Sequence, residues 1–94
     1  MLDITQNEKG DIILSGRFDA SQVEKAKSFF ASVQKSANVN FEKLEYISSA
    51  GLGVLLMTQK RLASLQHRLT LTHMSSHVRE VFKYAGFDNI FDIE

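Results

Sequence analysis

One stretch of the chain marks where a strand ends and a helix begins: Tyr46-Ile47-Ser48-Ser49-Ala50-Gly51-Leu52-Gly53-Val54-Leu55-Leu56. Apolar residues lead to two serines, and a small residue and two glycines come before a strongly apolar helical pattern. The first turn of a helix carries backbone N–H groups without partners and the positive end of the helix dipole. A hydroxyl there suits either an N-terminal cap or a group that carries phosphate.

The two glycines of this stretch need a physical reason. Gly51 and Gly53 each cost the helix about 1 kcal/mol relative to Ala. We therefore expect close packing, or the approach of another group to the backbone, to offset that cost. Spacing alone favours an N-cap as the role of the serines, and the glycines add weight to an approaching partner or phosphate.

The residues on either side of this stretch predict alternating strands and helices. Apolar alternation predicts strands at 2–5, 11–18, 39–47, 69–72 and 90–93, the first two joined by a turn at 7–10. Helical spacing predicts helices from Ser21, from Ala50 and from Ser75 or Ser76. Ser21 with Glu24 fits a capping box for the first helix. The order β-β-α-β-α-β-α-β predicts an α/β fold, a small mixed β-sheet with helices packed on one face.

Composition narrows the classes of function. The 94 residues predict one domain over 1–94, with 44% hydrophobic and 23% charged residues. Eleven basic and eleven acidic residues cancel, which argues against binding nucleic acid through bulk positive charge. The absence of Cys excludes disulfides and thiol chemistry. No apolar run approaches a membrane span and no signal peptide is evident, so we expect a cytoplasmic protein without direct membrane insertion.

No catalytic or metal constellation is evident from the sequence. No base accompanies Ser48 or Ser49, and neither a nucleophile-elbow motif nor a phosphate-binding loop is present. His73 and His77 are four apart but straddle a strand end and a helix start, without a third ligand. We therefore expect no catalytic residue, no metal and no cofactor, and a protein that is not an enzyme.

One acidic residue is expected near the serines. Asp19 follows the second strand, where its simplest role is to cap the next helix. If the second and third strands are neighbours, their carboxyl ends share one edge of the sheet, and Asp19 lies near Ser48 and Ser49. Ligands and partners bind at this edge in open α/β sheets.

The residues resemble the STAS domain family over nearly the whole chain, and the bacterial anti-sigma factor antagonists within it. The most specific part is the stretch 46–56, supported by 16–19, 39–41, 78–82 and 85–91. The resemblance implies a non-enzymatic switch. It binds an anti-sigma factor that is also a serine kinase, is released when that kinase phosphorylates it, and is restored by a PP2C-type phosphatase.

The resemblance also implies where the phosphate goes. The family's target hydroxyl lies two residues before the first glycine of the motif, which is Ser49 here. An acidic residue often precedes the target in the family, whereas this chain has Ser48 there, which keeps Ser48 as the alternative. The expected partner-binding surface consists of Asp19, Ser48, Ser49, Ala50, Gly51, Met57, Lys60 and Arg61.

Two further functions remain open from the sequence. Lone STAS domains also serve as structural subunits of transport complexes, with an ABC ATPase as the partner. A phosphorylation switch can also act in a regulatory relay whose output is not a sigma factor.

Overall fold

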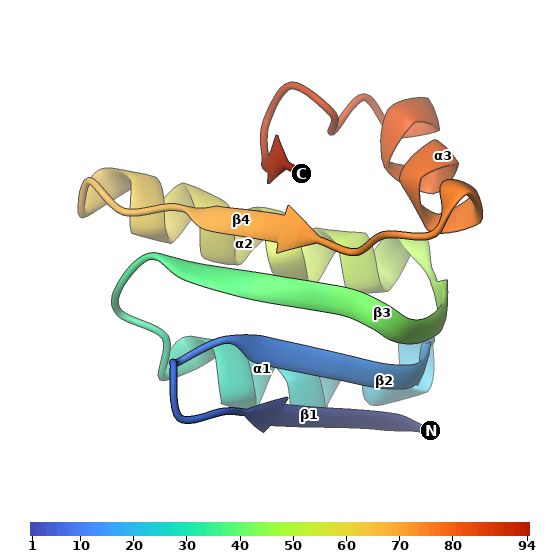
Figure 1. Ribbon diagram of the computed structural model, residues 1–94, viewed down its shortest axis with the longest axis horizontal. Helices are drawn as coiled ribbons and strands as arrows, with labels where there is room; N and C mark the ends of the chain where they lie inside the picture. Colours follow the sequence, from blue (N-terminus) through green and yellow to red (C-terminus); the bar gives the residue numbers. More distant parts are fainter.

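The computed structural model describes residues 1–94 as one sheet with three helices (Figure 1). The strands are β1 (Leu2–Gln6), β2 (Ile12–Phe18), β3 (Ala37–Ile47), β4 (Leu69–Thr72) and β5 (Asp92–Ile93). They lie in the order β1-β2-β3-β4-β5, antiparallel between β1 and β2 and parallel elsewhere. The helices are α1 (Val23–Ala31), α2 (Ser49–Ser64) and α3 (Ser76–Tyr84), with a 3-10 turn, η1, at Ala20–Gln22. The predicted mixed sheet and element order are confirmed.

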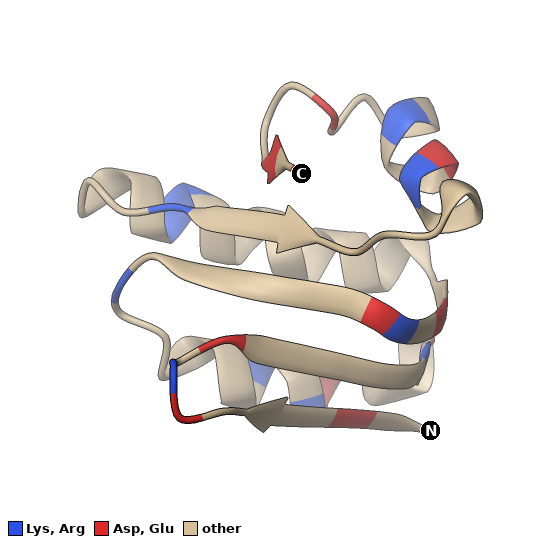
Figure 2. Cartoon of the chain, viewed as in Figure 1, with Lys and Arg blue, Asp and Glu red and all other residues tan.

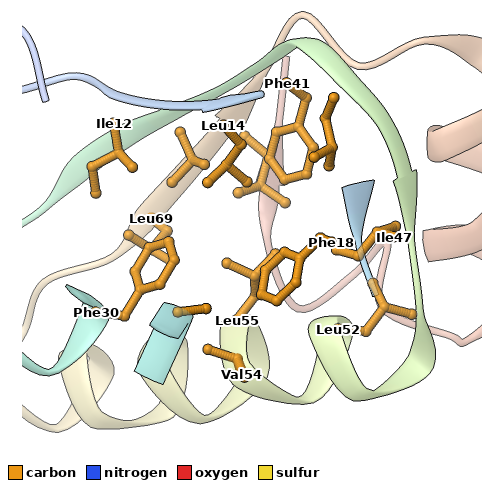
Figure 3. Packing of buried hydrophobic residues seen from close by; sticks show 14 of the residues in the cluster. Ile12, Leu14, Phe18, Phe30, Phe41, Ile47, Leu52, Val54, Leu55 and Leu69 are labelled. Carbon is orange, nitrogen blue, oxygen red and sulfur yellow. The ribbon is translucent and has the colours of Figure 1, made fainter. Parts of the chain in front are cut away.

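The helices cover one face of the sheet and enclose a single apolar core. Figure 1 shows α1 and α2 side by side behind the strands, and α3 beside the β4–β5 side. Alternate residues of β2 point into the core, where Leu14 and Phe18 belong to one buried cluster with Leu55 of α2 (Figure 3). Phe82 anchors α3 in this core, because its ring meets the rings of Phe41 and Phe91 edge to face.

The turns and helix ends follow the predicted chemistry with one exception. The Asn7 side chain accepts the N–H groups of Lys9 and Asp11 and so closes the β1–β2 turn. Gly86 has φ +78° at the end of α3, and the N–H of Phe87 bonds the carbonyl of Phe82, as a left-handed C-cap requires.

Of the two residues predicted to cap the first helix, Asp19 does so and Ser21 does not. Asp19, not Ser21, supplies the cap: its carboxylate accepts from the N–H and hydroxyl of Ser21. The capping box with Glu24 is therefore wrong. An η1 turn at Ala20–Gln22 precedes α1, because the cap lies two residues earlier than predicted.

The last strand is shorter than its apolar pattern suggested. β5 pairs with β4 only through Asp92 and Ile93. Phe91 is buried against the rings of Phe82 and Phe87, so it belongs to the core although it is not part of the strand pairing. No helix in the chain combines the length and the apolar character that crossing a membrane requires.

Candidate functional site

The carboxyl ends of β2 and β3 meet beside the start of α2. Phe18 pairs with Ile47 in the parallel register, and the N–H of Ser48 donates to the carbonyl of Phe18 at 2.9 Å. Asp19 follows Phe18 directly, so the structure brings it beside the serines. The condition set for the predicted proximity of Asp19 to Ser48 and Ser49, that the second and third strands are neighbours, is met.

The two serines have different surroundings. Ser48 is the N-cap of α2: its backbone is extended, and its Oγ accepts the N–H of Gly51 at 3.1 Å. Ser49 is the first residue of the helix, is exposed, and makes no side-chain hydrogen bond within the chain. Only the Ser49 hydroxyl is therefore free for an incoming group without loss of the cap.

The local electrostatics suit an anion at this helix start. The first N–H groups of α2, on Ser49 and Ala50, have no acceptor four residues back within the helix, and the helix dipole adds positive potential. The carboxylate of Asp19 does not occupy these N–H groups, because it accepts hydrogen bonds from the N–H and the hydroxyl of Ser21. The hydrogen bond from the Ser21 hydroxyl is the main reason why the pKa of Asp19 lies below its ordinary value.

The two glycines of the motif have different physical reasons. A Cβ on Gly51 would meet Phe18 and Ile47 at 3.0 Å, so close packing of α2 on the strand ends requires this glycine. A Cβ on Gly53 would meet nothing within 4 Å. Nothing inside the chain therefore offsets the helix-propensity cost of Gly53, and its bare backbone faces the surroundings.

The remaining predicted contact residues divide between the surface and the interior. Met57 and Lys60 are exposed on α2, on the same side of the helix as Ser49 and Gly53 by helical spacing. Gly51 is buried, so its predicted place on the exposed surface is wrong. Its role is to let the surface residues approach the strand ends.

Arg61 has a structural task that sequence reasoning missed. Its guanidinium donates to the carbonyl of Phe30 at 2.7 Å and to that of Val33 at 2.9 Å. These carbonyls lie at the carboxyl end of α1, where a cation also complements the helix dipole. No signal in the sequence pairs residues this far apart, so only the packing of α1 on α2 reveals the contact.

The three histidines do not form a cluster. The Nδ1 of His67 accepts the N–H of Ser36 at the opposite end of α2, whereas His73 and His77 are exposed. No three His, Asp or Glu side chains gather in a way that would hold a metal ion.

Comparison with known families decides what this arrangement belongs to. The family model described as "Mlab, STAS domain" matches residues 3–92, almost the whole chain. This chain belongs to the STAS domain family. The resemblance drawn from the serine-glycine stretch is thereby confirmed.

Sequence relatives of this STAS domain are named as anti-sigma factor antagonists. A Bordetella bronchiseptica protein so named, BtrV, is 39% identical over 74 residues, which cover 79% of this chain and 58% of the relative. The anti-sigma-B factor antagonist of Listeria monocytogenes is 27% identical over 88 residues, 89% of this chain and 77% of the relative. The matched region therefore spans little more than half of the Bordetella protein.

Solved structures share the fold of this STAS domain. An anti-sigma factor antagonist from Mycobacterium paratuberculosis superposes with a TM-score of 0.82 at 15% identity, covering 99% of this chain and 83% of that one. SpoIIAA in its unphosphorylated form gives 0.66 at 23% identity, covering 89% and 83%. The Bacillus cell fate determinant SpoIIAA in its phosphorylated form gives 0.72 at 20% identity, covering 100% and 91%.

Proposed function

We propose that this STAS domain is a non-enzymatic, phosphorylation-controlled protein-binding switch of the anti-sigma factor antagonist type. It binds an anti-sigma factor that is also a serine kinase while Ser49 is unmodified, and it is released when Ser49 is phosphorylated. A PP2C-type phosphatase resets it, and the cycle runs in the cytoplasm. The names of the relatives support the class, and the existence of a phosphorylated form of SpoIIAA supports the mode of control.

The observation that carries this proposal is the difference between the two serines. The Ser49 hydroxyl is exposed and unbonded, whereas the Ser48 hydroxyl caps α2 through the N–H of Gly51. A phosphate on Ser48 would have to displace this cap. A phosphate on Ser49 would stand at the helix start, where free N–H groups and the dipole favour its charge.

The switch acts at the binding surface rather than on the fold. Phosphorylation adds about −1.5 to −2 charges and three strong acceptor oxygens. A partner that covers Ser49 would have to desolvate that charge, which costs several kcal/mol when no compensating donor is present. A hundredfold loss of affinity needs only about 2.7 kcal/mol.

The proposed docking surface runs from the strand ends along the exposed side of α2. Asp19, Ser48, Ser49 and Ala50 lie at its start. Met57, Lys60 and Arg61 lie further along the helix, with the bare backbone of Gly53 between the two groups. Arg61 also lies on this surface, and its guanidinium keeps its hydrogen bonds to the carbonyls at the end of α1.

The test identifies the phosphorylated residue and compares the affinities of two variants for the kinase. The chain is incubated with ATP and the serine kinase that co-purifies with it, and the modified residue is mapped by mass spectrometry over residues 44–60. We expect phosphate on Ser49, none on Ser49→Ala, and full modification of Ser48→Ala at position 49. Ser49→Asp should bind the kinase about a hundredfold more weakly than Ser49→Ala. Equal affinity of these two variants would contradict the switch.

A second function is favoured by the description of the matching family model, which names Mlab. In that case the chain is a constitutive subunit that docks on the ATPase of a transport complex. Purification from native cells separates the two functions, because a stoichiometric ATPase that stays bound to Ser49→Asp supports the subunit. A kinase that is lost with this variant supports the switch.

A further inference from the structure

The two helices behind the sheet leave an apolar groove between them. The groove has a volume of about 390 Å³ and is lined mainly by Lys27 and Phe30 from α1 and by Val54, Met57, Thr58 and Arg61 from α2. Phe30 and Val54, which form its floor, are almost completely buried, and Figure 3 shows them on the two adjoining helices. Met57 stands on its rim with 67% of its surface exposed.

An exposed methionine beside a groove with an apolar floor is suited to a partner's side chains. Methionine is flexible and polarizable, so it adapts to apolar groups of different shape. A groove between two helices accepts an amphipathic helix, whose apolar residues at spacings of three and four enter it together. The groove therefore has the shape and lining of a helix-docking site.

The charged side chains around the groove indicate which kind of partner would bind there. Lys27 and Arg61 line it and Lys60 follows on α2, whereas no Asp or Glu lines it. The only salt bridge in the chain joins Arg68 to Asp92, so Lys27 and Lys60 have no carboxylate partner. Figure 2 shows Lys and Arg on both α1 and α2. Cations unpaired within the chain complement acidic residues of a partner.

We infer that the α1–α2 groove binds an acidic amphipathic helix of a partner protein. Its apolar stripe packs on Phe30, Val54 and Met57, and its Asp or Glu residues lie against Lys27 and Lys60. The groove shares Met57 and Arg61 with the docking surface proposed above, so this inference rests in part on that proposal. The peptide test below needs neither the kinase nor phosphate on Ser49, so a failure of the groove and a failure of the switch can be told apart.

The test uses the full chain, labelled with nitrogen-15, and two synthetic amphipathic helices of about 18 residues. Both peptides carry Leu at helical spacing; one has Glu along the flanks of the Leu stripe and the other has Lys at the same positions. We expect saturable shifts of amide signals within 27–31 and 54–61 with the Glu peptide. Its affinity should exceed that of the Lys peptide by about tenfold at low salt and fall as salt is added.

Variants of the groove complete the test. Met57→Glu and Lys27→Glu should each lower the affinity for the Glu peptide about tenfold, while the amide spectrum remains that of the folded protein. Lys83→Glu, which reverses an exposed lysine on α3, is the matched control and should leave the affinity unchanged. Equal affinity for both peptides, shifts outside the groove, or equal weakening by all three variants would overturn the inference.

Discussion

At the scale of single residues, the small residues at the start of α2 have different roles. Ser48 caps the helix, Ser49 presents a free hydroxyl, Gly51 permits close packing and Gly53 leaves the backbone bare. Each task has a different physical cause, so each can be separated from the others by a single substitution.

The two serines should differ in their effect on stability. Ser48→Ala removes the acceptor of the Gly51 N–H and should lower the free energy of unfolding by about 1 kcal/mol. Ser49→Ala removes no hydrogen bond and should change it by less than about 0.5 kcal/mol. Urea denaturation of the two variants measures the difference. An equal loss in both would show that Ser49 also stabilises the helix start.

The two glycines should respond to alanine in opposite directions. Gly53→Ala places a methyl group in open space and should raise the free energy of unfolding by up to about 1 kcal/mol. Gly51→Ala forces its methyl group against Phe18 and Ile47, and overpacking of this kind costs about 1–3 kcal/mol, so a net loss is expected. Thermal unfolding checks both. If a partner crosses the helix at Gly53, the more stable Gly53→Ala variant should also bind its kinase more weakly.

At the scale of elements, side chains at the helix ends fix how each helix meets its neighbours. Asp19 ends the connection from β2 and caps η1, and Arg61 of α2 bonds the carboxyl end of α1. These contacts set how the helices lie against the strand ends, and hence the position of the docking surface.

Arg61 should contribute more to stability than its neighbour Lys60. Arg61→Met keeps the length of the side chain, leaves the carbonyl of Val33 without its donor and removes one of the donors to the carbonyl of Phe30, which should cost about 1–3 kcal/mol. Lys60→Met is the control, since Lys60 is exposed and makes no hydrogen bond within the chain. Guanidinium denaturation compares them, and a loss in Arg61→Met no greater than in the control would contradict the role of Arg61 as a clamp.

Asp19 should make stability depend on pH in the acidic range. Hydrogen bonds from Ser21 lower the pKa of the folded carboxyl, so its contribution is present above the pKa of the unfolded chain. That contribution is lost as the pH falls through the folded pKa, below about pH 4. Asp19→Asn should therefore flatten the acid limb of a plot of unfolding free energy against pH. The same slope in both proteins would mean that Asp19 is not the group responsible.

At the scale of the whole molecule, one buried side chain joins three of the segments that follow β3. The Oε1 of Gln59 on α2 accepts the N–H of Leu69 at 2.8 Å, and its Nε2 donates to the carbonyl of Ile90 at 3.3 Å. Gln59 therefore connects α2, which carries the proposed docking surface, to β4 and to the segment before β5. β5 itself pairs with β4 through only two residue pairs, so this contact adds to the ion pair of Arg68 with Asp92 in holding the carboxyl-terminal segment.

Loss of this connection should loosen the carboxyl-terminal part first. Gln59→Leu leaves a buried N–H and a carbonyl unpaired, which should lower the free energy of unfolding by about 1–3 kcal/mol. Amides of residues 90–94 should then exchange with solvent faster, by a larger factor than those of β2. Gln59→Glu keeps the acceptor for Leu69 but places a buried carboxylate oxygen against the carbonyl of Ile90, so it should cost at least as much as Gln59→Leu. Uniform acceleration of exchange throughout the chain would contradict a local role.

The sequence by itself determined the order of strands and helices and the STAS resemblance, and it pointed to the start of α2 as the proposed site. Periodicity, caps and glycines are local patterns, and they act over spans that the sequence displays directly. Only the tertiary structure decided which serine is free, which glycine is buried, what Arg61 binds and where a groove remains. Those outcomes depend on contacts such as that of Gly51 with Phe18, between residues distant along the chain, whose positions are set by packing.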